Sequence, residues 1–89
     1  MAVVEQAVRI VNELGLHARP AAAFVKVAGR YQSDIQIRRD DMTVNGKSIM
    51  GVMTLAAERG SELVIVAEGA DAEAAVQALA GLVKGGFKE

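Results

Sequence analysis

The chain has 89 residues, a formal net charge of −1 and an apolar content of 52%, which together fit one compact domain over residues 1–89 and exclude a disordered tail. With no cysteine and one histidine, disulfides, thiolate chemistry and multi-histidine metal sites are excluded, so we expect no metal and no cofactor. The balanced charge argues against nucleic-acid binding, and no apolar run is long enough for membrane insertion.

The N-terminal part of the chain predicts a strand followed by a helix. Residues 4–11 alternate imperfectly between apolar and polar side chains, as a strand does. After a loop comes an Ala-rich stretch with Pro20 near its start. Proline is tolerated only in the first helical turn, so this helix is expected to begin near His17 or Ala18 and to end near Gly29. The first residues also lack a signal peptide, and we expect a cytoplasmic protein.

The middle of the chain predicts a hairpin and a short helix. Residues 34–38 and 42–45 are expected to pair as antiparallel strands across a polar turn at 39–41. A short helix follows over 49–55. Ser48 directly precedes this helix, and its hydroxyl is expected to cap it.

The C-terminal part predicts a strand and a long helix. Residues 63–67 are apolar on both faces, so this strand is expected to be covered on both sides. Asp71 is expected to cap the final helix. Its apolar stripe comprises Ala72, Ala75, Val76, Leu79, Leu82 and Val83. The order βαββαβα predicts an α+β fold with helices on one face of a four-stranded antiparallel sheet.

The lone histidine stands at the predicted start of a helix, two residues before Arg19. Histidine is a poor helix cap, and a cation beside a helix N-terminus opposes the macrodipole. Two locally unfavourable choices indicate a site for anions, because helix-start amides attract phosphate and Arg19 adds a planar donor. The positive helix end also disfavours an imidazolium, which leaves His17 neutral and nucleophilic. Spacing alone leaves two other interpretations open, a structural His17 and a solvated Arg19 paired with a carboxylate.

Two motifs identify a family resemblance. The run from Gly15 to Ala21 and the run from Asn45 to Met53 resemble the histidine-containing phosphocarrier (HPr) family of the bacterial phosphoenolpyruvate-dependent sugar phosphotransferase system. The resemblance implies an open-faced β-sandwich with three helices on one face. It also implies that phospho-enzyme I phosphorylates His17 on its δ1 nitrogen, that Arg19 stabilises the phosphoryl group, and that the A domain of an enzyme II receives it.

The resemblance also assigns roles to the second motif. Ser48 matches the serine that an ATP-dependent HPr kinase/phosphorylase modifies in many bacteria. The resemblance further implies that the first two helices form a docking face for enzyme I and enzyme II A domains. The candidate contact residues are Ala22, Lys26, Lys47, Ile49, Met50 and Met53.

Three functional classes stay open at this stage. The first is a monomeric phosphoryl carrier, an intermediate in transfer rather than a free-standing turnover enzyme. The second is a mainly regulatory phosphoprotein modified on Ser48, on His17 or on both, including a role in the nitrogen branch of the phosphotransferase system. The third is a ligand-sensing or RNA-binding module of similar shape, although one Tyr, two Phe and no Trp offer few rings for base stacking.

Overall fold

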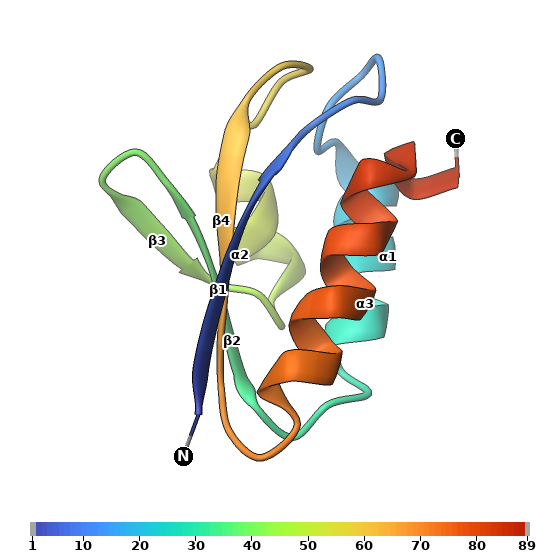
Figure 1. Cartoon of the computed structure of the whole chain (residues 1–89). Coiled ribbons are helices and arrows are strands. Elements are labelled where there is room, and N and C mark those ends of the chain that lie inside the picture. The colour runs from blue at the N-terminus through green and yellow to red at the C-terminus, as the bar shows by residue number, and fades with distance from the viewer. Residues whose placement is uncertain (1, 89) are drawn as a thin grey trace.

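The computed structural model describes residues 2–88 and places four strands and three helices there in the predicted βαββαβα order (Figure 1). The strands are β1 (Val3–Arg9), β2 (Asp34–Arg39), β3 (Met42–Asn45) and β4 (Glu62–Glu68). The helices are α1 (Ala18–Ala28), α2 (Ile49–Thr54) and α3 (Ala72–Lys84), and a short 3-10 turn, η1 (Gly86–Lys88), follows. The sequence does not predict η1, which buries Phe87 at the end of α3.

The sheet is antiparallel throughout and has the order β1-β4-β2-β3. Strand β4 is central, with Ala67 opposite both Val4 of β1 and Ile35 of β2. Strands β2 and β3 form the predicted hairpin. Arg39 pairs with Met42 and therefore belongs to β2, so the predicted turn is one residue too long.

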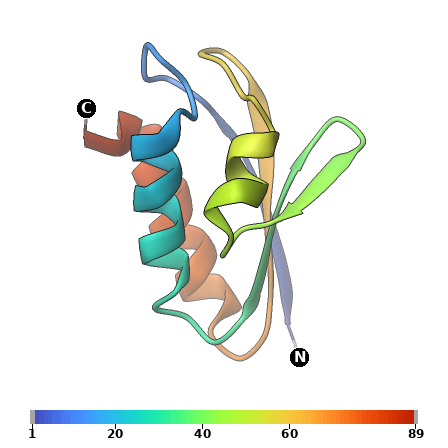
Figure 2. The same cartoon turned by 180° about the vertical axis from the view of Figure 1, so that it is seen from behind.

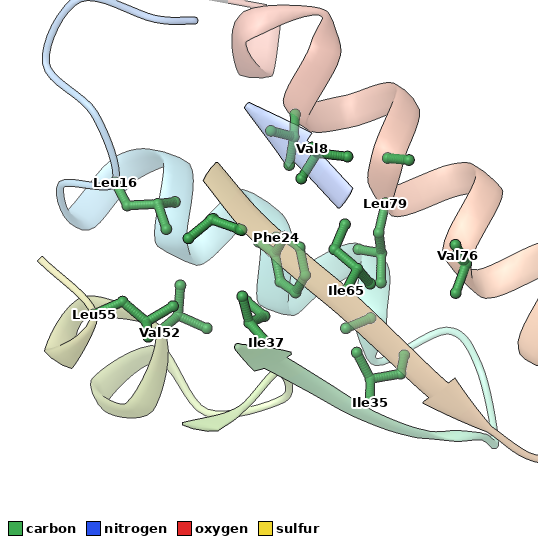
Figure 3. Packing of buried hydrophobic residues seen from close by; sticks show 14 of the residues in the cluster. Val8, Leu16, Phe24, Ile35, Ile37, Val52, Leu55, Ile65, Val76 and Leu79 are labelled. Carbon is green, nitrogen blue, oxygen red and sulfur yellow. The ribbon is translucent and has the colours of Figure 1, made fainter. Parts of the chain in front are cut away.

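All three helices lie on one face of the sheet, as the fold prediction required (Figures 1 and 2). Alternate side chains of the strands point into this layer, and Ile35, Ile37 and Ile65 are fully buried there. Phe24 of α1 and Leu79 of α3 fill the space above them (Figure 3). Each such side chain contributes about 1.5–3 kcal/mol by leaving water. Because α1 and α2 both pack buried side chains into this cluster, it holds the starts of these two helices in place.

The other face of the sheet carries no helix among residues 2–88 (Figure 1). Val64 and Val66 of β4 are only half-buried there, so the prediction that this strand is covered on both faces is wrong. Cross-strand charges accompany them, with Arg38 and Glu5 joined at 3.2 Å. In the described part of the chain, no helix has both the length and the apolar composition to cross a membrane.

Asp71 occupies the predicted N-cap position of α3, but its side chain does not cap that helix. Its carboxylate instead accepts hydrogen bonds from the backbone N–H groups of Gln32, at 2.8 Å, and Ser33, at 2.9 Å. The Ser33 hydroxyl donates a further bond to the same carboxylate. The cap prediction is therefore wrong for this side chain, because partners from the segment between α1 and β2 outcompete the local amides.

Candidate functional site

The loop before α1 is held rigidly in place. The Asn12 Nδ2 donates to the Gly15 carbonyl at 2.7 Å, and the Gly15 N–H donates back to the Asn12 carbonyl at 3.2 Å. Gly15 has a φ of +69°, and a Cβ there would lie 2.4 Å from the Ala57 carbonyl oxygen. The Leu16 N–H donates to that same carbonyl at 2.9 Å, with the Leu16 side chain buried. These contacts fix the position from which the next residue, His17, projects.

His17 is the N-cap residue of α1, where the sequence predicted the helix to begin. Its backbone is extended, with φ −74° and ψ −174°, and its carbonyl accepts the Ala21 N–H at 3.0 Å. Its side chain is half-buried and does not cap the helix. The N–H groups of Ala18 and Arg19 belong to the first turn, where a helix has no preceding carbonyl to accept them. The imidazole therefore stands beside the positive end of α1.

His17 and Arg19 line one surface hollow of about 660 Å³, so the structure brings the two predicted residues together. The loop before the helix supplies one wall, and the end of α3 supplies the other. The remaining lining residues are Val11, Asn12, Glu13, Leu14, Lys84, Gly85 and Gly86. Sequence reasoning missed Lys84, which is remote from the motif along the chain and reaches the hollow only through packing of α3 beside α1. Two of the lining residues, Arg19 and Lys84, are cationic, and their charge suits an anion.

Ser48 caps α2 as predicted, because its Oγ accepts the Gly51 N–H at 3.1 Å. The side chain is half-buried at the start of the helix. The neighbouring Lys47 is held by two bonds: its N–H donates to Asn45 Oδ1 at 2.9 Å, and its Nζ donates to the Tyr31 carbonyl at 2.7 Å. Lys47 therefore ties the entry of α2 to the segment after α1, in addition to any surface role.

The short helix α2 separates its apolar residues between core and surface. Val52 and Leu55 are buried, as predicted, whereas Met50 is 80% exposed. Ile49 and Met53 are also exposed, and on α1 the side chains of Ala22 and Lys26 face solvent. The two helices lie side by side in Figure 2 and contact each other. Five of the predicted contact residues thus lie exposed on two adjacent helices. The sixth, Lys47, lies just before α2 and is half-buried.

Comparisons with known proteins agree with this geometry. The family described as "PTS HPr component phosphorylation site" matches residues 4–85. The chain is 50% identical over 86 residues to the phosphocarrier protein HPr of Treponema pallidum, covering 97% of this chain and 98% of that protein. It is 44% identical over 81 residues to the HPr-like protein Crh of Bacillus subtilis, covering 91% and 95%.

Solved structures show the same fold. An HPr structure from Thermoanaerobacter tengcongensis superimposes with a TM-score of 0.93 at 44% identity, covering 97% of each chain. An HPr structure from Bacillus anthracis gives 0.88 at 51% identity, covering 93% of this chain and 99% of that one. The chain therefore belongs to the HPr family and is a phosphocarrier protein of the phosphotransferase system.

Proposed function

We propose that His17 is the residue that carries the phosphoryl group, accepting it from phospho-enzyme I and passing it to the A domain of an enzyme II for sugar uptake. The observation that supports this assignment is the shared hollow: His17, the N-cap residue of α1, and Arg19 of its first turn both line it. Apart from this site, the chain offers no second histidine for the role. The protein is then an intermediate in transfer and has no turnover of its own.

The transfer step follows from the chemistry of a neutral imidazole. The Nδ1 lone pair attacks phosphorus while the bond from phosphorus to its donor atom in phospho-enzyme I breaks, and the donor keeps that electron pair. Nε2 keeps its proton. The phosphoryl oxygens then lie beside the amides of Ala18 and Arg19 and the Arg19 guanidinium, which stabilise their charge. The reverse step on an enzyme II A domain returns His17 to its starting state. This scheme assigns no cofactor and no metal.

The direct test is phosphorylation with phosphoenolpyruvate and enzyme I. The chain is expected to gain one acid-labile, base-stable phosphate, and His17→Ala is expected to gain none. Arg19→Gln is expected to slow transfer at least about tenfold, because a charge-assisted bond to the moving group is worth about 1.5–3 kcal/mol. Arg38→Gln, which changes the same charge on the opposite face of the sheet, serves as the control. A normally labelled His17→Ala protein would overturn the assignment.

We further propose that α1 and α2 form the docking face for both protein partners. The exposed apolar residues Ile49, Met50 and Met53 support this, because flexible methionines suit a surface that meets more than one partner. Ala22 and Lys26 extend the face along α1, and Lys47 borders it. We propose that the protein acts as a single-domain monomer in the cytoplasm.

Ser48 supports a second, regulatory function. Its Oγ lies at the start of α2, within the proposed docking face, so a phosphate there would place two negative charges between the partners. A solved relative, 44% identical, is described as Crh, the Bacillus subtilis catabolite repression HPr, and that name supports a regulatory function. An HPr kinase/phosphorylase would be the modifying partner. Mass spectrometry of the chain from its own cells separates the carrier from a regulatory role through Ser48: phosphohistidine at His17 supports the carrier, and phosphoserine alone at Ser48 supports a mainly regulatory role.

A further inference from the structure

The charged residues around His17 come from three separate segments. Among residues 2–88, the charged residues lining the hollow besides the histidine are Glu13 from the loop, Arg19 from α1 and Lys84 from the end of α3. All three side chains are exposed. Glu13 and Arg19 carry one formal charge of each sign, so these three residues sum to +1 because of Lys84. We propose that Lys84 is a third element of the phosphoryl site, the cation that makes the hollow positive for a phosphate dianion. This inference rests on the proposed role of His17.

The position of Lys84 suits this role. It is the last residue of α3, and Gly85 and Gly86 turn the chain away directly after it. A lysine presents a compact charge on a flexible four-carbon stem, so its ammonium can follow a phosphoryl group that arrives and leaves. Arg19, by contrast, lies in the first turn of α1 beside the reacting residue. The two cations approach the hollow from different helices and can contact different phosphoryl oxygens.

A purely structural role is the competing explanation. A lysine in the last turn of a helix interacts favourably with the negative end of the helix dipole. That effect is present whether or not His17 carries phosphate. A role in the site is different, because it couples Lys84 to the phosphoryl group and is reciprocal. The two roles are therefore separated by measurements that compare the phosphorylated with the unphosphorylated protein.

The first experiment measures the equilibrium constant for phosphoryl exchange with phospho-enzyme I. Lys84→Gln is expected to lower this constant about threefold at low salt, as loss of one partly screened charge near a dianion does. Lys84→Arg is expected to retain it, and Arg38→Gln controls for net charge. The second ionisation of the phosphoryl group, followed by phosphorus NMR, should move about 0.3 pH units upward in Lys84→Gln. Both effects should shrink in 0.5 M salt.

Charge rescue provides the sharper test. Glu13→Gln in the Lys84→Gln background removes the one acidic group that lines the hollow in the described chain, and it should restore the exchange constant to within about a factor of two of the original. If Lys84 acted only through the dipole of α3, a change at Glu13 in the loop before α1 would not restore the exchange constant. An exchange constant unchanged in Lys84→Gln, or lowered but not rescued, overturns the role of Lys84. Absence of phosphate on His17 in the unaltered chain would instead overturn the proposed function.

Discussion

At the scale of single residues, the site depends on Gly15, and the structure shows why the motif has glycine at this position. Gly15 combines a φ of +69° with a close approach to the Ala57 carbonyl, so any side chain meets both backbone strain and a backbone atom that cannot swing aside. Both constraints act two residues before His17. The loop therefore cannot relax around a side chain at position 15 without displacing His17 and the start of α1.

Gly15→Ala is accordingly expected to destabilise the fold by about 1–3 kcal/mol and to slow phosphoryl transfer as well. The matched control is Gly60→Ala, because Gly60 also has a positive φ, of +90°, but a Cβ there meets nothing within 4 Å. Urea unfolding and the labelling rate with enzyme I measure the two effects. Equal losses of stability in both variants would show that the contact with Ala57 contributes nothing.

At the scale of elements, α2 depends on its cap. It has only six residues, and isolated helices of that length are not stable in water. The Ser48 side chain satisfies the Gly51 N–H, while Val52 and Leu55 anchor the helix to the core. The Ser48 hydroxyl and the buried Val52 and Leu55 side chains thus hold the exposed side of α2 in place. Ser48 belongs both to the helix cap and to the proposed docking face.

Two substitutions separate the cap from the charge at Ser48. Ser48→Ala removes the acceptor and should cost about 1 kcal/mol of unfolding free energy, with a smaller effect on transfer. Ser48→Asp keeps an acceptor and adds a negative charge, so it should retain stability but weaken association with enzyme I. Unfolding curves and titration calorimetry report these quantities. Unchanged affinity in Ser48→Asp would contradict a regulatory effect of charge at this position.

The long helix α3 contains a glycine with no structural requirement. Gly81 is exposed within the helix, and a Cβ there meets nothing within 4 Å. Because glycine is less favourable than alanine in a helix interior, Gly81→Ala should stabilise the protein by about 0.5–1 kcal/mol. Thermal unfolding measures the gain. A destabilised variant would show that this end of α3 needs backbone freedom, for instance to place Lys84.

At the scale of the whole molecule, local patterns predicted much of the fold. Alternation in β2 and the cap at Ser48 depend on neighbouring residues, and both predictions are confirmed. The position of His17 at the start of α1 followed from the fixed geometry of proline in the same way. Features set by packing between distant segments were not predictable: Lys84 at the hollow and the use of the Asp71 carboxylate depend on where α3 settles.

Asp71 links the start of α3 to the segment that follows the C-terminal end of α1, whereas His17 is at the N-terminal end of that helix. The Ser33 hydroxyl, followed by the Gln32 N–H, holds the pKa of the Asp71 carboxyl below its usual value. A carboxyl whose pKa is lower in the folded than in the unfolded chain stabilises the fold above the unfolded value, about 3.9. That stabilisation disappears as the pH falls through the lower, folded pKa.

Asp71→Asn should therefore unfold more easily than the original chain at pH 7, and the difference should narrow as the pH falls from about 5 towards 2. The other carboxyl groups titrate in both proteins, so their contributions to the pH dependence of stability cancel in this difference. Asp41→Asn, an exposed change in the β2–β3 turn, is the control and should show no such convergence. Urea unfolding at a series of pH values decides the matter. A difference that stays constant down to pH 2 would mean that the charged carboxylate does not hold these segments together, and that Ser33 binds a neutral partner equally well.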